Sequence, residues 1–143
     1  GKKIVIFFFP RADTSGCTAE SIAFTSLQHE FDKLNCVVIG ISKDNPKKQG
    51  KFREKYNLTC ELGADFENNV CEQFGVWVEK SMYGKKYMGI QRSTFLSNEK
   101  GIITNVWEKV KVPGHAEEVL ETVKSLNNWF IFSFQLLVLK QIQ

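Results

Sequence analysis

The sequence is poor in the residues that build metal centres and disulfide scaffolds. Its 143 residues include two histidines and four cysteines: Cys17, Cys36, Cys60 and Cys71. No two cysteines form a C-x-x-C pair, which excludes a zinc ribbon and a dithiol redox centre of the C-x-x-C type. Neither His29 nor His115 lies near a cysteine in the sequence, so no metal-ligand pattern is complete. We expect intracellular thiols, one or more of them reactive.

The sequence also lacks a strong charge of one sign and a long apolar run. The 19 basic and 16 acidic residues give a net charge of +3, and the basic residues occur in scattered pairs, so we expect no nucleic-acid binding. The longest apolar run, residues 129–139, has 11 residues, which is too few to span a bilayer. No charged-then-apolar leader opens the chain, which predicts a cytoplasmic protein without a membrane partner.

The chain does contain a regular succession of apolar segments. The expected elements are, in order, a buried strand over 4–9, a helix over 18–34, a buried strand over 37–41, a helix beginning at Asn45–Pro46, a short strand near 60–62, a helix that Asp65 caps and that carries Phe66, Val70 and Phe74, a hairpin with strands 93–96 and 102–107, and a helix over 116–123. Crossover units give parallel strands and the hairpin adds antiparallel ones. We therefore predict one α/β domain with a mixed central sheet and helices on both faces.

Cys17 differs from the other cysteines in its position. It follows the first buried strand and a polar loop, and it stands at the start of the first predicted helix. Unpaired N–H groups and the positive end of the helix dipole favour a thiolate there, and the thiolate is the nucleophilic form. An inert, buried cysteine at a helix start is the alternative.

The residues around Cys17 carry a specific pattern. Pro10, Thr14 and Cys17 form P-x-x-x-T-x-x-C, with Gly16 before the cysteine and Glu20 one turn after it. This pattern resembles the peroxiredoxins. Together with the stretches 9–18, 75–80, 87–96 and 110–120, it resembles the bacterioferritin comigratory protein, or peroxiredoxin Q, subfamily, over most of the chain from Lys2 to Leu126.

The resemblance implies a fold and an activity. Members of the family have a thioredoxin-like fold and reduce hydrogen peroxide and organic hydroperoxides without a metal or an organic cofactor. Cys17 would be the peroxidatic cysteine, which becomes a sulfenic acid. The reductant would be thioredoxin or possibly glutaredoxin, and we expect a monomer that serves antioxidant defence.

The resemblance also implies roles for the residues around the cysteine. Thr14 would place its hydroxyl beside the peroxide, and Arg92 would hold the thiolate charge and stabilise charge on the oxygens. Pro10 would shield the sulfur, and backbone N–H groups at Gly16 would complete the pocket. Glu20 would orient the site. Taken singly, these residues could instead be a helix cap, a surface charge, a strand terminator and a first-turn acid that the helix dipole favours.

The cysteine that resolves the sulfenic acid is not at either usual position of the subfamily. Those positions align with Ile22 and with a site near Arg53. Cys36 and Cys71 are expected in the core, whereas Cys60, flanked by polar residues, is expected to be the least buried. Two hypotheses remain: a one-cysteine mechanism that uses an external thiol, or a disulfide between the nucleophile and Cys60.

The two ends of the chain also depart from the subfamily. We expect a catalytic domain over residues 1–127, without the N-terminal hairpin of the family, and an apolar extension over 128–143. The extension could pack on the core, contact a partner or a membrane surface, or be a read-through of the gene. Two rival functions are a noncatalytic binding or chaperone-like protein and a cysteine hydrolase that uses His29 or His115 as its base.

Overall fold

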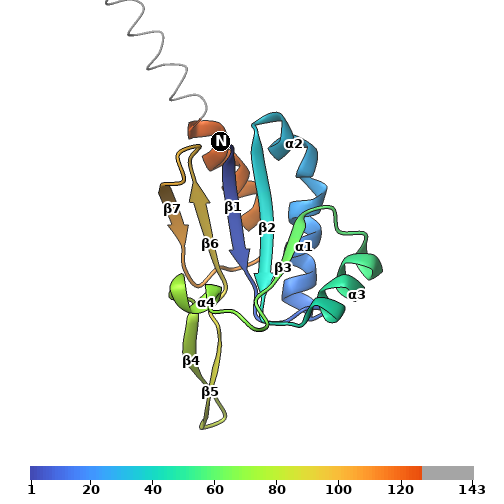
Figure 1. Cartoon of the computed structure of the whole chain (residues 1–143), viewed down its shortest axis with the longest axis vertical. Helices are drawn as coiled ribbons and strands as arrows, with labels where there is room; N and C mark the ends of the chain where they lie inside the picture. Colours follow the sequence, from blue (N-terminus) through green and yellow to red (C-terminus); the bar gives the residue numbers. More distant parts are fainter. Residues whose placement is uncertain (127–143) are drawn as a thin grey trace, which may run out of the picture.

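A five-stranded mixed sheet forms the centre of the computed structural model, which describes residues 1–126 (Figure 1). β1 is its middle strand, parallel to β2 and antiparallel to β6. β3 extends the sheet beside β2 in parallel, and β7 extends it beside β6 in antiparallel. The order is β3-β2-β1-β6-β7, with the bounds β1 Lys3–Phe8, β2 Cys36–Ser42, β3 Glu61–Ala64, β6 Ser93–Ser97 and β7 Ile103–Trp107.

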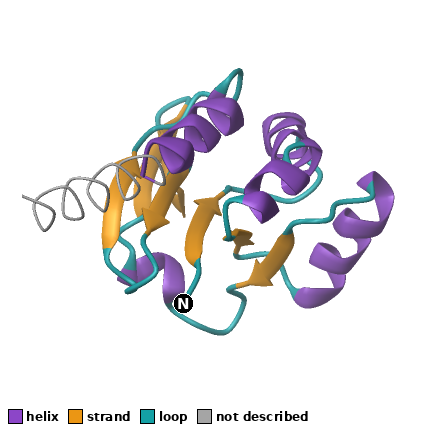
Figure 2. Ribbon diagram, turned by 90° about the horizontal axis from the view of Figure 1, so that it is seen from above, coloured by secondary structure: helices purple, strands orange, loops and turns teal. Residues whose placement is uncertain are grey.

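Helices cover both faces of this sheet (Figure 2). Their bounds are α1 Ser15–Ser26, α2 Gln28–Lys33, α3 Pro46–Tyr56 and α4 Val70–Gln73, and a further helix runs over residues 115–126. Side chains of α1, α2, α3 and helix 115–126 share one core cluster, and those of α4 belong to another. The predicted mixed sheet with helices on both faces is confirmed.

The side chains of β1 separate the two clusters. Val5, Phe7 and Phe9 enter the cluster under α1, and Phe8 enters the cluster under α4, because alternate residues of a strand point to opposite faces. Phe7 stacks on Phe24 of α1 with ring centroids 4.6 Å apart. Phe9 directly follows β1, and it is fully buried like the three β1 side chains; burial of a phenylalanine contributes about 1.5–3 kcal/mol. The strand that carries the functional loop is therefore fixed from both sides.

The continuous helix predicted over 18–34 is wrong, because the chain forms two helices that meet at Leu27. The Leu27 N–H donates to the carbonyl of Phe24, three residues back, which tightens the last turn of α1. The break changes the direction of the chain while Phe24 and Phe31 both stay in the core, with ring centroids 6.0 Å apart.

The two expected helix caps have different outcomes. Asn45 caps α3 as predicted, since its Oδ1 accepts a hydrogen bond of 2.8 Å from the Lys48 N–H. The Asp65 carboxylate accepts from the N–H groups of Val70 and Cys71, at 3.2 and 2.8 Å, so it does cap the next helix. That helix, however, begins only at Val70. Phe66 lies outside it and is exposed, contrary to the prediction.

A second hairpin was not predicted from the sequence. β4 (Trp77–Met82) and β5 (Lys85–Ile90) form a two-stranded antiparallel sheet that projects from the lower end of the molecule in Figure 1. Its turn residues, Tyr83 and Gly84, both have positive φ, at 52° and 77°. Two positive φ values are typical of the tight type I′ turn, whose twist matches that of the flanking strands.

Within residues 1–126, no helix is long and apolar enough to cross a membrane. The apolar extension expected over residues 128–143, and the domain boundary placed just before it, lie outside the described residues.

Candidate active site

The predicted nucleophile lies where β1 ends and α1 begins. Pro10 follows β1 in the chain, and the polar loop leads to Thr14, which occupies the N-cap position of α1. Cys17 is the third residue of that helix. The first hydrogen bond of the helix joins the Thr18 N–H to the Thr14 carbonyl at 2.9 Å, so the N–H groups of the first three residues have no acceptor in the helix. They and the helix dipole favour negative charge beside Cys17.

Contacts with the neighbouring helix α3 and with the residues before it hold this loop. The Ala12 N–H donates to Asp44 Oδ2 at 2.7 Å. The Asp13 carboxylate accepts a hydrogen bond of 3.0 Å from Lys55 and a second one from the Tyr56 hydroxyl. The loop that leads to the nucleophile is thus anchored at Ala12 and Asp13.

Arg92 is the side chain that contacts the sulfur. Its Nη2 donates to Cys17 Sγ at 3.3 Å, and its Nη1 donates to Glu20 Oε1 at 2.7 Å. Arg92 lies between β5 and β6, whereas Cys17 and Glu20 are almost one turn apart on α1. The structure therefore brings together three residues that are up to 75 positions apart in the chain.

Burial increases the strength of these charge interactions. Cys17 and Glu20 are each 1% exposed. Burial raises the pKa of Glu20 to about 7, against an opposing effect of the Arg92 guanidinium. Burial also opposes the charge of Arg92, but the neighbouring Glu20 and Cys17 outweigh it and raise the pKa of Arg92. Arg92 thus stays a cation, while Glu20 changes its charge near neutral pH.

Gly16 makes room for this arrangement. A Cβ at that position would lie 3.1 Å from Nη2 of Arg92, which is closer than an ordinary van der Waals contact. The absence of a side chain lets the guanidinium lie across the first turn of α1, beside the sulfur.

Thr14 and Pro10 lie in the loop but make no side-chain hydrogen bond to Cys17. The Thr14 hydroxyl donates to the Arg11 carbonyl at 2.7 Å, and it does not cap the helix. The Thr14 hydroxyl proton is therefore already used in a hydrogen bond, and the hydroxyl oxygen can only accept a further one. Pro10 is half-buried at the base of the same loop.

The prediction that Cys60 is the least buried cysteine is wrong, because Cys60 is 1% exposed and packs in the main core cluster. The Thr25 hydroxyl of α1 donates to its sulfur at 3.8 Å and accepts from the Thr59 N–H at 3.3 Å. Arg53 holds the Cys60 carbonyl at 3.2 Å. The polar neighbours point outward while the thiol points inward, and burial raises its pKa.

The other two cysteines are buried, as predicted. Cys36 is 2% exposed in the main cluster, and Cys71 is fully buried in the cluster under α4. Burial raises the pKa of each thiol to about 12, so neither is a thiolate at neutral pH.

A cysteine hydrolase needs a histidine that is hydrogen-bonded to its nucleophile, and the two histidines here have other surroundings. His115 Nε2 pairs with the Thr94 hydroxyl at 2.7 Å, and its ring lies edge-on to Phe24 and Trp107. His29 is exposed on α2. Among residues 1–126, no hydrogen bond joins either histidine to Cys17.

Comparison with known proteins shows what this arrangement is similar to. A sequence model of the AhpC/TSA family matches residues 1–106. The putative peroxiredoxin Bcp of Coxiella burnetii is 50% identical over 120 residues, covering 84% of this chain and 80% of the relative. Peroxiredoxin Bcp of Bacillus subtilis is 45% identical over 127 residues, covering 89% and 81%.

Solved structures agree with these relatives. A variant of Xanthomonas campestris peroxiredoxin Q superposes with a TM-score of 0.84 at 42% identity, covering 87% of this chain and 80% of the other. The bacterioferritin comigratory protein of the same organism, studied for its alkyl peroxide reduction, gives a TM-score of 0.83 at 41% identity, covering 87% and 80%. The thioredoxin-like α/β fold that the resemblance implies is confirmed by these neighbours. The family match, the identities and the shared fold together show that this chain belongs to the AhpC/TSA family, among the Bcp and peroxiredoxin Q members of the peroxiredoxins.

Proposed function

We propose that this chain is a thiol-dependent peroxidase that reduces hydrogen peroxide and organic hydroperoxides through Cys17. The observation that carries the proposal is the 3.3 Å contact between Cys17 Sγ and the Arg92 guanidinium at the start of α1. The thiolate attacks the outer peroxide oxygen, the O–O bond breaks, and the cysteine becomes a sulfenic acid. The other oxygen takes a proton and leaves as water or an alcohol.

The surrounding groups act on the charge that moves during this step. Negative charge passes from the sulfur to the leaving oxygen, and Arg92 and the first-turn N–H groups stabilise it at both places. Glu20 Oε1 accepts a hydrogen bond of 2.7 Å from the guanidinium, which holds the cation in the site. The free lone pairs of Thr14 can accept the proton of the hydroperoxyl group and so align the O–O bond with the sulfur. Pro10 has no N–H and shields the same side of the pocket.

The peroxidase proposal is tested by peroxide consumption with thioredoxin, its reductase and NADPH. We expect Cys17→Ser to consume peroxide at the background rate of the reductant, while Cys36→Ala, which removes a core thiol, keeps wild-type turnover. Equal rates in the wild type and Cys17→Ser would reject the assignment. They would favour instead a noncatalytic binding or chaperone-like protein on the same scaffold.

For the return to the thiol we propose a one-cysteine mechanism. Cys60 contacts Thr25, which is eight residues beyond Cys17 on α1 and so about 12 Å further along the helix axis. A disulfide needs Cα atoms within about 7 Å, and the contact with Thr25 places Cys60 beside the far end of α1, away from Cys17. The position of the usual same-helix partner carries Ile22, which is 43% exposed. An external thiol, from thioredoxin or glutaredoxin, is the simpler reductant.

Mass spectrometry of the peroxide-treated chain without reductant separates the two mechanisms. We expect a sulfenic acid on Cys17 that dimedone traps, in the wild type and in Cys60→Ser alike. An intramolecular disulfide that contains Cys17 and disappears in Cys60→Ser would sink the one-cysteine mechanism.

The proposed setting of the enzyme is antioxidant defence in the cytoplasm, where thiol reductants are present. We propose that it acts as a monomer, because the contacts that complete the site come from one chain. Size-exclusion chromatography with light scattering of the reduced enzyme tests this; a dimer at micromolar concentration would contradict it.

A further inference from the structure

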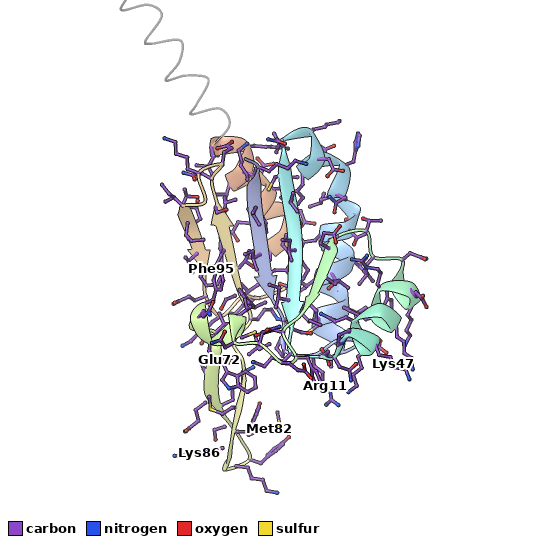
Figure 3. The ribbon with its side chains drawn as sticks, in the orientation of Figure 1. Arg11, Lys47, Glu72, Met82, Lys86 and Phe95 are labelled. Carbon is purple, nitrogen blue, oxygen red and sulfur yellow. The ribbon has the colours of Figure 1, made fainter. Side chains whose placement is uncertain are left out.

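A cavity of about 430 Å³ lies between helix α3 and the loop over residues 11–13, which leads to the nucleophile. We call it the α3 cavity. Its volume lies in the range of about 300–1,000 Å³ that is usual for small-molecule sites. Figure 3 shows Arg11, a lining residue, at the lower end of the molecule. One wall of the α3 cavity is therefore the loop before Cys17, and the peroxidase mechanism gives the cavity no role.

Helix α3 supplies the opposite wall through one of its faces. The lining residues of this helix are Lys48, Lys51, Phe52 and Lys55. They are three, four and seven positions apart from the first of them, so they lie on the same side of the helix. Phe52 is 2% exposed and belongs to the main core cluster, whereas the three lysines are exposed. The wall is thus apolar at its base and positively charged toward solvent.

Basic residues outnumber acidic ones around the α3 cavity. Its lining contains four basic and two acidic side chains, which gives a net charge of +2. Both carboxylates already have partners within the protein. Asp13 accepts hydrogen bonds from Lys55 and Tyr56, and Asp44 accepts from a backbone N–H and a hydroxyl, at 2.7 Å each. The negative charges of the lining are therefore held by the protein itself.

Three cations of the lining are left for a ligand: Arg11, Lys48 and Lys51. Among residues 1–126, no carboxylate lies within 4.0 Å of their charged nitrogens, and their side chains donate no hydrogen bond. Like charges that surround one cavity repel one another, and an anion bound between them replaces this repulsion with attraction. The α3 cavity therefore has the size and the charge of a site for a small anion.

We propose that the α3 cavity binds a small phosphate monoester, with its phosphate group between Arg11, Lys48 and Lys51. A phosphate monoester carries about 1.5 to 2 negative charges at neutral pH, which matches the net charge of the lining. Its three oxygens accept from a guanidinium, which can bind two of them at once, and from ammonium groups, which act as point charges. The organic part of the ester fills the remaining volume beside Phe52. This site is separate from the peroxide pocket and does not depend on the peroxidase function.

A ligand in this position joins the loop to α3. It contacts Arg11 on one wall and the two lysines on the other, next to the existing contacts of Ala12 with Asp44 and of Asp13 with α3. An added link of this kind opposes local opening of the loop. We therefore expect the backbone amides of residues 11–14 to exchange their hydrogens more slowly when the site is occupied.

The test is isothermal titration calorimetry of the reduced chain in a phosphate-free buffer of low ionic strength, with phenyl phosphate as the probe. We expect one saturable site, with an affinity that decreases as salt is added. Benzenesulfonate has a similar shape and a single charge, and we expect it to bind about tenfold more weakly. No saturable binding of phenyl phosphate below about 1 mM would refute the site. An equal affinity for inorganic phosphate would refute the ester as the ligand.

Two matched lysine variants of α3 locate the binding. Lys51→Met removes a cation of the lining, and Lys47→Met removes an exposed cation of the same helix that does not line the cavity and is labelled in Figure 3. We expect Lys51→Met to weaken phenyl phosphate binding about tenfold and to abolish the slowed exchange of residues 11–14, as for loss of one charge-assisted contact. Lys47→Met should bind within about twofold of the wild type. Equal weakening in the two variants would show diffuse attraction to a basic helix and refute the site.

Discussion

Arg92 contacts two groups that compete for its charge, the Cys17 sulfur and the Glu20 carboxylate. Its two terminal nitrogens serve one group each, at 3.3 and 2.7 Å. A lysine carries one ammonium centre and lacks this planar fork. The second oxygen of Glu20 is buried and has no hydrogen-bond partner among the described residues. A neutral carboxyl group suits such a position better than a carboxylate does, which agrees with the raised pKa of Glu20.

Glu20→Gln is expected to change the pH dependence of peroxide reduction. When Glu20 loses its proton near pH 7, its negative charge partly cancels the positive potential of Arg92 at the sulfur. The rate per thiolate therefore falls as the pH rises through about 7. Glutamine keeps an acceptor for Arg92 but never ionises. The variant should therefore keep, across the whole pH range, the rate per thiolate that the wild type shows at low pH. The measurement is the rate constant with hydrogen peroxide from pH 5 to 9, divided by the thiolate fraction from ultraviolet absorbance. A fall near pH 7 that persists in the variant would contradict this account.

The residues of the site differ in how far sequence could identify them. The position of Cys17 at a helix start follows from local patterns alone. Arg92 lies 75 residues away, and only the family resemblance placed it beside the cysteine. Cys60 was misjudged because its polar neighbours indicate exposure, whereas Arg53 holds its carbonyl and the Thr25 hydroxyl donates to its inward-pointing sulfur. Side-chain direction in a short, irregular segment depends on tertiary contacts that a sequence window does not contain.

The elements that present the site are fixed by capping and by turn geometry. Asp65 holds the start of α4, and Gly75 ends that helix with a φ of 72°, in the left-handed region that favours glycine. The next residue, Val76, is buried, and its carbonyl accepts from the Gln91 N–H at 2.8 Å, which closes the base of the hairpin. The end of α4 is therefore joined to the base of the hairpin through Gly75 and Val76, and Arg92 directly follows Gln91 at that base.

A pair of glycine substitutions tests this geometry. No atom lies near a Cβ built at Gly75 or at Gly50, so steric overlap is absent from both. Gly75→Ala forces alanine into positive φ and should lower the free energy of unfolding by about 1 kcal/mol. Gly50→Ala, inside α3, should raise it by about 0.5–1 kcal/mol. Urea denaturation of both variants decides the matter, and the same sign for both would contradict the assigned backbone.

Most of the elements could be predicted from the sequence, and the failures have physical causes. β1, β2 and β6 carry the β-branched and aromatic runs typical of buried strands, and β7 carries a similar run although most of its side chains are exposed. β4 and β5 lack that signal because most of their side chains are exposed, and only the base of the hairpin reaches the core. The break at Leu27 depends on a single tightened turn, which periodicity does not detect.

At the scale of the whole molecule, the two core clusters on either side of β1 hold the catalytic loop to the sheet. His115 lies beside the larger cluster, against Phe24 and Trp107. It is 4% exposed and forms a hydrogen bond with the Thr94 hydroxyl. Burial lowers the pKa of His115 below its ordinary 6.5, with Arg92 acting in the same direction and Glu118 against it. The neutral ring is therefore part of the folded state.

This predicts a loss of stability in acid. Below about pH 6.5 the unfolded chain binds a proton at this histidine while the folded chain does not, so the free energy of unfolding decreases as the pH falls toward the lowered pKa. The slope from this group is at most about 1.4 kcal/mol per pH unit. The raised pKa of Glu20 acts in the opposite direction between pH 4.5 and 7, so the comparison must be with variants. In urea titrations at several pH values, His115→Gln should lose the decrease in the free energy of unfolding that this histidine causes in acid. His29→Gln should keep that decrease. Equal curves for the wild type and His115→Gln would contradict the assignment.

The central claim is that peroxide oxidises the sulfur of Cys17, because only that thiol combines a helix start with a bound guanidinium. One measurement tests it directly. The reduced chain receives one equivalent of hydrogen peroxide in the presence of dimedone, and peptide mapping then gives the fraction of each of the four cysteines that is labelled. The account predicts labelling confined to Cys17 in the wild type and strongly slowed in Arg92→Met, by roughly 100-fold, as for loss of one charge-stabilising donor. Labelling at Cys36, Cys60 or Cys71 in preference to Cys17 would contradict it.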